Sequence, residues 1–248
     1  MMYEASEFVF QCGQDIARSR RVLIKPSAGF ALPYPVTTSR ETLGAIIRGI
    51  RRVSEADILL LEGPESGEHV RTIYRMLGYD FPRVLGLDVR DCTLVEVENP
   101  LPKPFALPSY FVPNVVLSCD YLISVTPFRV FRDQGWLTIA NLLGLLPQAK
   151  YGDIIGRQRG GLTRSNLNAV IADLYFTVPF DQGIIDARIK FTCEDDLTEG
   201  AVEEFGKIFA GDPLSTDCEA AGRTDVQTPY LHLITSAKAE FEAHSTHK

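Results

Sequence analysis

The chain has 248 residues, of which 45% are hydrophobic and 23% are charged. These proportions are typical of a soluble globular protein and exclude a disordered or fibrous chain. The 25 basic and 32 acidic residues leave a net charge of −7, which disfavours a nucleic-acid partner because an acidic protein repels phosphate. The length permits a single domain or two closely packed lobes.

The start of the chain and its apolar runs predict where the protein resides. Residues 1–10 include Glu4 and Glu7 and lack a basic stretch followed by an apolar one, so we expect no secretory signal. The longest apolar run, residues 136–146, is shorter than the ~20 residues that cross a bilayer. We therefore expect a cytoplasmic protein that makes no membrane contact.

The cysteine pattern predicts no metal centre. The five cysteines form no Cys-x-x-Cys pair, which disfavours a zinc site and an iron–sulfur cluster. A magnesium site would have to be built from carboxylate side chains, and no spacing of acidic residues in the sequence requires such a site. No motif in the sequence requires a cofactor or identifies one.

The first half of the chain alternates buried strands with amphipathic helices. Continuous apolar runs at residues 22–24, 58–61 and 84–87 are typical of strands that are covered on both faces. Apolar side chains at helical spacing predict helices over residues 43–50 and 70–77. This alternation indicates an α/β fold, with a mainly parallel sheet and helices on both faces.

The second half begins after a proline-rich segment. Five prolines lie between residues 100 and 113, a density that is not compatible with a central strand. We predict four parts: an N-terminal α/β half over 1–98, a crossing segment or joint over 99–113, a C-terminal half of the same unit over 114–242, and a frayed tail over 243–248. The other predicted strands are 93–97, 115–117, 121–125, 183–189 and 205–209, and the other predicted helices are 136–146, 162–175 and 229–241.

Several short motifs resemble, in order, those of the domain-of-unknown-function 362 family. Residues 22–27 (Val-Leu-Ile-Lys-Pro-Ser) resemble its strand leading into Lys-Pro-Asn, and residues 35–38 resemble its Thr-rich turn. Residues 60–64 resemble its acidic-Gly turn, and residues 140–147 are similar to its Lys-Asn-Leu-x-Gly helix. Residues 210–217 are similar to its Gly-x-Asp-Pro-Val-Ala-x-Asp stretch.

The resemblance extends over about residues 20–222 and implies an α/β unit of poorly assigned chemistry, often found with ferredoxin-type iron–sulfur modules. The chain also departs from the family. Where the family commonly has Pro-Lys-x-Lys-x-His, residues 126–131 read Thr-Pro-Phe-Arg-Val-Phe, which keeps one basic residue, Arg129. Ser27 and Ala140 replace an Asn and a Lys of the family motifs. Whether the missing Lys and His mean a lost or a changed activity is open.

Polar residues at predicted strand ends are the first candidates for a site, because ligands of open α/β sheets bind there. Lys25, Glu62 and Thr126 occupy such positions. Lys25 is either an anion-binding or basic group or a solvated surface charge. Glu62 either transfers protons or caps its turn and pairs with Lys25.

Other candidates come from loops and helices. Asn141 lies among leucines, where a buried amide either ties backbone segments together or contacts a ligand. Asp212 precedes a proline and is expected to cap a helix, which places Asp217 one turn inside it. The predicted catalytic residues are Lys25, Glu62 and Asp217, and the predicted substrate-binding residues are Ser27, Thr37, Thr38, Thr126, Arg129 and Asn141.

The leading hypothesis is an enzyme of small-molecule metabolism, related to lyases or isomerases, that acts on an organic acid or a similar anion. Lys25 and Arg129 would hold the anion and Glu62 would transfer a proton, in an isomerisation, elimination or cyclisation. One alternative is a non-catalytic partner or subunit that docks an iron–sulfur protein, and another is a metal- or cofactor-dependent redox enzyme. Aromatic residues near the proline-rich segment would line either a pocket or a homodimer contact.

Overall fold

One mixed sheet dominates the computed structural model, which describes residues 1–155, 164–178, 180–194 and 196–245. Its strands are β1 (Met2–Glu4), β2 (Arg21–Pro26), β3 (Asp57–Glu62), β4 (Val84–Asp88), β7 (Tyr121–Phe131), β8 (Gln134–Trp136), β9 (Gln182–Cys193) and β10 (Ala201–Gly211). They follow the order β1-β10-β9-β7-β2-β3-β4, with β8 paired to β7. Strands β9, β7, β2, β3 and β4 run parallel, whereas β10, β1 and β8 pair antiparallel. The mainly parallel sheet is therefore confirmed.

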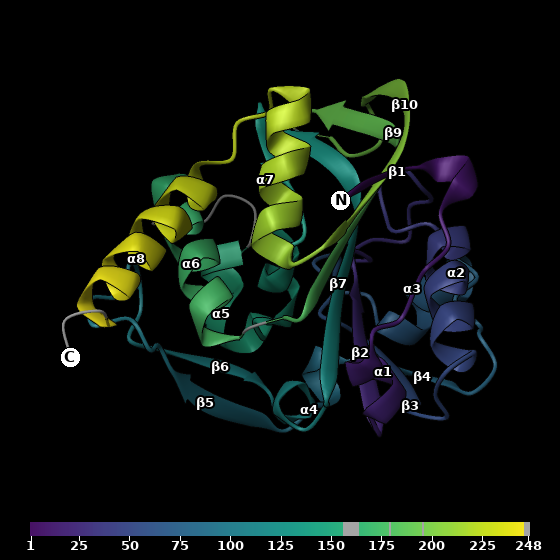
Figure 1. Ribbon diagram of the computed structural model, residues 1–248, viewed down its shortest axis with the longest axis horizontal. Helices are drawn as coiled ribbons and strands as arrows, with labels where there is room; N and C mark the ends of the chain where they lie inside the picture. The colour runs from purple at the N-terminus through teal and green to yellow at the C-terminus, as the bar shows by residue number, and fades with distance from the viewer. Residues whose placement is uncertain (156–163, 179, 195, 246–248) are drawn as a thin grey trace.

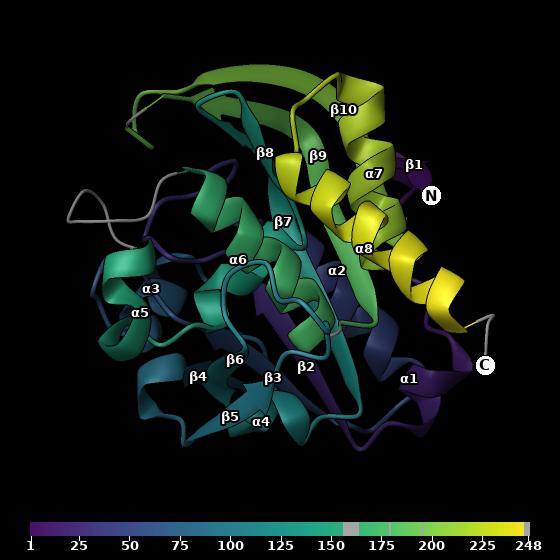
Figure 2. The same cartoon turned by 90° about the vertical axis from the view of Figure 1, so that its left-hand side faces the viewer.

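Helices cover both faces of this sheet, as predicted. The helices are α1 (Gln14–Arg18), α2 (Arg40–Arg51), α3 (Val70–Met76), α4 (Asn114–Leu117), α5 (Gln148–Ile155), α6 (Arg164–Thr177), α7 (Pro213–Thr224) and α8 (Pro229–Ser245), with 3₁₀ turns η1 (Ala5–Glu7), η2 (Val89–Asp91) and η3 (Ala140–Leu145). Helices α1, α2 and α3 lie on one side of the strands (Figure 1), and α6, α7 and α8 lie on the other, which faces the viewer in Figure 2. Strands from both predicted halves of the chain share the sheet.

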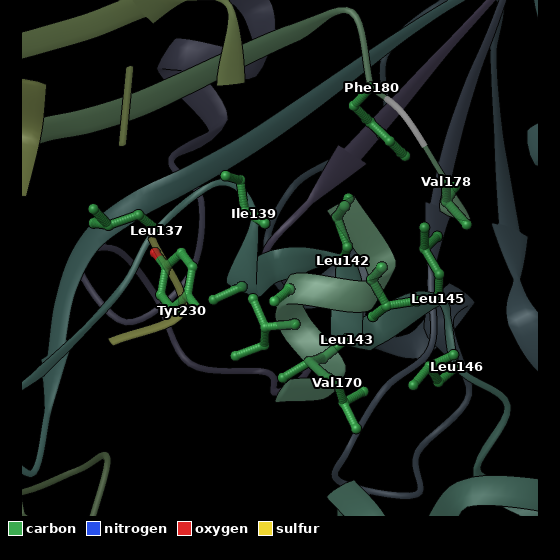
Figure 3. Packing of buried hydrophobic residues seen from close by; sticks show 14 of the residues in the cluster. Leu137, Ile139, Leu142, Leu143, Leu145, Leu146, Val170, Val178, Phe180 and Tyr230 are labelled. Atoms are coloured by element: carbon green, nitrogen blue, oxygen red, sulfur yellow. The ribbon is translucent and has the colours of Figure 1, made fainter. Parts of the chain in front are cut away.

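The alternation of side chains along each strand builds two cores. Val22 and Ile24 of β2 join the cluster beneath α1, α2 and α3, while Leu23 between them joins the cluster on the opposite face. The second cluster is centred on η3, whose leucines pack against Val170 of α6 and Tyr230 of α8 (Figure 3). Each fully buried aliphatic side chain stabilises the fold by about 1.5–3 kcal/mol.

A separate two-stranded ribbon carries the proline-rich segment. It consists of β5 (Leu94–Glu98) and β6 (Ser109–Pro113), which pair antiparallel at the lower left of Figure 1. The buried Asp173 of α6 accepts hydrogen bonds from the backbone amides of residues 105–107 and from the Tyr110 hydroxyl, at 2.8–3.0 Å. This carboxylate replaces the hydrogen bonds that a proline-rich loop cannot make with itself.

Two predicted elements are wrong. Residues 115–117 lie in the short helix α4 and not in a strand, because an apolar run of three residues does not distinguish the two. The predicted helix 136–146 is helical only over η3. Before η3, Trp136 ends strand β8 and residues 138–139 form a turn, in which the amides of Thr138 and Ile139 donate to the Asp217 carboxylate instead of to carbonyls within a helix.

The remaining predicted strands and helices are present, within about four residues at their ends except for the predicted strand 121–125, which continues as β7 to Phe131. Leu162, the predicted start of α6, lies outside the described residues, and so does the end of the predicted tail, although α8 continues to Ser245. Among the strands and α-helices, β1, α1, β6, β8 and α5 were not predicted, and β6 forms the end of the segment predicted to be a proline-rich crossing. No helix in the described part of the chain has the length and apolar character needed to cross a membrane.

Candidate functional site

A buried ion pair lies where β2 and β3 reach the carboxyl edge of the sheet. Lys25 Nζ is 2.7 Å from Glu62 Oε1, and the two side chains are 1% and 3% exposed. Burial lowers the pKa of Lys25, and the neighbouring Glu62 opposes part of that effect. Two neighbouring parallel strands bring these residues together, as their positions at the ends of predicted strands indicated.

Asn141 of η3 completes this group. Its Oδ1 accepts a hydrogen bond from Lys25 Nζ at 3.2 Å, and its Nδ2 donates to the Lys25 carbonyl at 3.0 Å and to Ser124 Oγ at 3.1 Å. Lys25 Nζ also donates to the Pro26 carbonyl at 2.8 Å. All three protons of the ammonium therefore have partners, and Lys25 offers no further donor to an anion in this arrangement.

Glu62 is less completely bonded than Lys25. Its Oε1 accepts from Lys25 and from the amide of Gly63 at 3.0 Å, and its Oε2 accepts from the amide of Ala28 at 2.7 Å. A carboxylate has about four acceptor positions, so one position on Oε2 is left among the contacts of the described residues. The Tyr74 hydroxyl is buried without a hydrogen-bond partner. Burial raises the pKa of Tyr74 well above its usual value, and the charge of the nearby Glu62 raises it further.

Two glycines allow the backbone to close over the ion pair. A Cβ on Gly144 would lie 2.4 Å from Glu62 Oε1 and 2.8 Å from Lys25 Nζ, and a Cβ on Gly63 would lie 2.5 Å from the Gly144 carbonyl oxygen. Any larger residue at position 144 would have to displace the charged groups. The glycine in the middle of η3 is therefore required for this close approach.

Arg129 is a cation whose guanidinium keeps a donor without a hydrogen-bond partner. Its Nη1 donates to the Val36 carbonyl at 3.1 Å and its Nη2 to Ser27 Oγ at 2.9 Å, whereas the buried Nε has no partner. Burial lowers the pKa of Arg129, and the charges of Glu65 and Glu62 oppose this effect from a distance. Within the described part of the chain, no carboxylate forms an ion pair with this guanidinium.

The threonines predicted to bind substrate are bonded to the backbone. Thr38 Oγ1 accepts from the Ser27 amide at 2.8 Å and donates to the Val125 carbonyl at 2.9 Å. Thr37 Oγ1 donates to the Leu32 carbonyl at 2.5 Å. The hydrogen bond from Thr38 to Val125 attaches the loop between β2 and α2 to β7, and the hydrogen bond from Thr37 to Leu32 lies within that loop. Both hydroxyl groups therefore have protein partners and hold the loop in place.

Thr126 does not lie at a strand end, which corrects its predicted position. Strand β7 continues to Phe131, and the pairing with β9 shifts register between Pro127 and Phe128. The proline suggested the end of a strand, but an irregularity in the pairing accommodates it inside β7. Thr126 Oγ1 donates to the Pro127 carbonyl at 3.0 Å. Arg129 consequently lies on the strand itself.

Asp217 is buried in α7 and holds the chain leading to η3. It accepts from the amides of Thr138 and Ile139 at 3.0 and 2.9 Å, from Thr138 Oγ1 at 2.6 Å and from the Tyr230 hydroxyl at 3.3 Å. Ser124 Oγ donates to the Thr138 carbonyl at 2.8 Å. Asp217 is thus linked to Asn141 through Ser124 and Thr138, and it contacts neither Lys25 nor Glu62. Its predicted capping neighbour, Asp212, does accept from the Ser215 amide.

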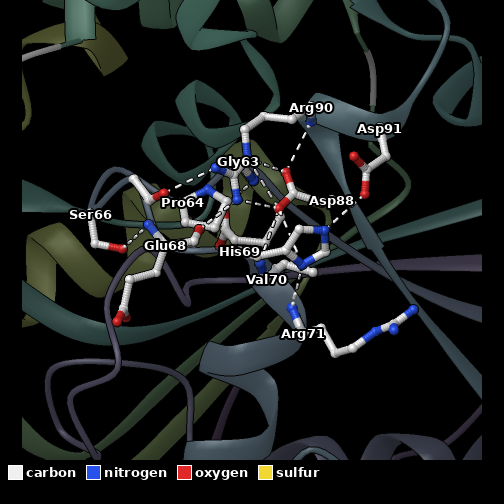
Figure 4. A network of polar contacts seen from close by, with 12 residues as sticks. Gly63, Pro64, Ser66, Glu68, His69, Val70, Arg71, Asp88, Arg90 and Asp91 are labelled. Carbon is white, nitrogen blue, oxygen red and sulfur yellow. Dashed lines mark hydrogen bonds and ion pairs between the residues drawn. The ribbon is translucent and has the colours of Figure 1, made fainter.

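Two further polar clusters near the same edge of the sheet were not predicted from the sequence. Asp88, which follows the apolar run of β4 as Glu62 follows that of β3, accepts from Arg90 and from the Val70 amide (Figure 4). Arg90 also donates to the carbonyls of Gly67 and Glu68 and so fixes the loop before α3. The equivalent position after a strand was a signal that could have identified Asp88.

The second missed cluster joins β9 to α2. Asp186 is fully buried and accepts from Arg188 Nη2 at 2.7 Å, from Thr42 Oγ1 at 2.6 Å and from the Tyr34 hydroxyl at 3.1 Å. Arg188 Nη2 also donates to Ser39 Oγ, the N-cap of α2, at 2.6 Å. No local sequence pattern identifies this cluster, because Asp186 and Arg188 meet residues 34–42, which are about 145 positions away in the chain.

The described residues contain no group of three or more His, Cys, Asp or Glu side chains arranged to hold a metal ion. The five cysteines are unpaired, and only Cys193 is buried.

Comparison with known proteins agrees with this architecture. The structure of the lactate racemase apoprotein from Thermoanaerobacterium thermosaccharolyticum is similar, with a TM-score of 0.55 and 14% sequence identity over 88% of this chain and 52% of that one. The TM-score supports a shared fold, and the chain spans about half the length of that protein. No curated protein sequence gives a significant match. The family model of a domain of unknown function, DUF362, matches residues 22–222, and the chain therefore belongs to this family.

Proposed function

We propose that the protein is an enzyme that binds a small organic anion at Arg129 and catalyses a proton-transfer reaction, such as an isomerisation, with Glu62. The observation that carries the proposal is the guanidinium of Arg129. It has neutral hydrogen-bond partners and a buried, unbonded Nε, at the sheet edge that also holds the Lys25–Glu62 pair. Arginine is well suited to bind a carboxylate because several of its donors lie in one plane.

Glu62 is the proton acceptor in this proposal. Its remaining acceptor position would take a proton from the carbon next to the bound carboxylate, and this proton would exchange with solvent on Glu62. Return of one proton to the carbon restores the number of atoms and the charge, and its return to the opposite face of the carbon gives an isomerisation. Lys25 acts as a positioning residue, because its Nζ lies 2.7 Å from Glu62 Oε1 and holds this carboxyl group in place. Asn141 in turn holds Lys25.

The fold comparison supports the same reaction class. The similar structure is named as a racemase of lactate, a small organic acid, and a racemase is an isomerase. An elimination or a cyclisation starts with the same removal of a proton. The products formed in the experiment below distinguish these reactions.

The test is solvent exchange in heavy water. Purified protein is incubated with lactate and with a panel of small carboxylic acids, and incorporation of deuterium next to the carboxylate is followed by NMR. We expect exchange with at least one acid, with kcat/KM reduced at least tenfold in Arg129→Gln. The control is Arg71→Gln, which changes an exposed arginine on α3 and should exchange at the wild-type rate.

Binding is measured in parallel by calorimetry with the same acids. Weaker binding in Arg129→Gln, with circular dichroism unchanged, supports the anion site. Binding without exchange of any acid overturns the enzymatic role and leaves a binding protein. Failure of every acid to bind overturns the whole proposal.

A further inference from the structure

We propose that the anion bound at Arg129 is a monocarboxylate with an apolar substituent, which packs on the side chains of Leu32, Val36, Phe131, Phe191, Cys193 and Leu197. These six residues, here called the apolar group, form a small cluster separate from the two main cores. The inference rests on the proposed function and adds the class of substrate to it.

The pairing of β7 with β9 places the guanidinium beside this group. Arg129 is in register with Phe191, and Phe131 is in register with Cys193, so all four side chains leave the same face of the two strands. The backbone of Val36 contacts the guanidinium directly through the hydrogen bond from Nη1 to its carbonyl. The cation and the apolar surface are therefore adjacent parts of one region.

The apolar group is only partly covered by the protein. Val36, Phe191 and Cys193 are buried, whereas Leu32, Phe131 and Leu197 are partly exposed around them. Covering such side chains with an apolar substituent removes hydrocarbon surface from water on both partners. A carboxylate at Arg129 would also supply an acceptor for the unbonded Nε.

Acidic residues in a pocket that Cys193 lines disfavour a second carboxylate. A cavity of about 300 Å³ is lined by Thr192, Cys193, Glu194, Asp196 and Glu199, three of which are acidic. The negative potential of these side chains opposes a dianion that extends in that direction. A neutral substituent avoids this repulsion, so the ligand class is a monocarboxylate.

The test measures the dissociation constants of acetate, butanoate, hexanoate, phenylacetate and succinate by calorimetry. We expect each added methylene to tighten binding about two- to fourfold, as partial burial of a CH₂ group predicts, and succinate to bind more weakly than butanoate. In Leu32→Ser, acetate should bind as in the wild type, while the gain from acetate to hexanoate should shrink at least threefold. The control is Leu85→Ser, which changes a 56% exposed leucine on β4 and should leave the whole series unchanged.

The outcomes separate this inference from the proposed function. Equal affinity for acetate and hexanoate, or tighter binding of succinate than of butanoate, overturns the inference while the anion site stands. Loss of all binding in Arg129→Gln but not in Leu32→Ser supports both. If no acid in the series binds to the wild-type protein, both are overturned. The wild-type series alone decides the question even where a variant fails to fold.

Discussion

The Lys25–Glu62 pair links stability to the proposed chemistry at the scale of single residues. In Lys25→Met, Glu62 would remain buried with two backbone amides and no cation. Removing one partner of a buried pair typically costs about 3–5 kcal/mol. We expect a loss of this size in the free energy of unfolding, measured by urea denaturation.

A double-mutant cycle tests whether the two residues are coupled. Adding Glu62→Gln to Lys25→Met removes the uncompensated charge, so the double variant should be more stable than the sum of the single losses predicts, by about 1–3 kcal/mol. Additive losses, or a loss below about 1 kcal/mol in Lys25→Met, would contradict the closed ion pair. Activity of either variant is meaningful only where circular dichroism shows the native fold.

The sequence left open whether Glu62 pairs with Lys25 and whether Asn141 ties segments of the protein together, and the contacts show both. The reason is simple: neighbouring parallel strands bring their ends together, and an amide among leucines must find buried partners. The sequence did not predict that all donors of the Lys25 ammonium would be bonded within the protein. That outcome depends on Gly144, whose role follows from a contact between distant segments.

The contact between η3 and the strand ends is tested at the scale of elements. In Gly144→Ala, the added methyl group would overlap Glu62 Oε1 and Lys25 Nζ, both held by hydrogen bonds. Overpacking of this kind costs about 1–3 kcal/mol. We expect a lower unfolding midpoint in urea and weaker binding of carboxylates at Arg129, because the sheet edge must shift.

Gly152 of α5 provides the matched control. A Cβ at this position meets no atom within 4 Å. Since alanine favours a helix over glycine by up to about 1 kcal/mol, Gly152→Ala should be neutral or stabilising. Equal stability of the two variants would show that η3 does not close tightly over the ion pair.

Elements whose pattern is local were predicted well, and those shaped by distant contacts were not. The strands 22–24 and 58–61 are buried on both faces and carry a strong apolar signal. The segment 136–146 carries a similar signal, but Asp217, about 80 positions later, captures its backbone amides. Pattern analysis within a short window cannot detect this competition.

The whole molecule depends on one sheet that is assembled from both ends of the chain. Strand β1, the first in sequence, pairs with β10, and β7 of the second half lies between β2 and β9. These long-range pairings give the two predicted halves a shared sheet. Polar anchors such as Asp217 and Asp173 then attach helices and loops to its face.

The global stability should depend on pH through Asp217. Burial raises the pKa of Asp217 to about 6, because desolvation of the carboxylate outweighs the hydrogen bonds from Thr138, Ile139 and Tyr230. In the unfolded chain an aspartate has a pKa of about 3.9. Between about pH 4 and 6 the folded protein therefore binds more protons, and this group's contribution to the free energy of unfolding falls as the pH rises.

Comparison with Asp217→Asn isolates this contribution, because asparagine has nearly the shape of a neutral carboxyl group and does not titrate. The buried carboxylates Asp88 and Asp186 have lowered pKa values, so their stabilisation is lost only at more acidic pH. We expect the stability of the wild type relative to Asp217→Asn to fall by about 2 kcal/mol from pH 4 to pH 7. Parallel stability profiles, measured by urea denaturation across this range, would show that Asp217 is ionised throughout and that its four donors outweigh its burial.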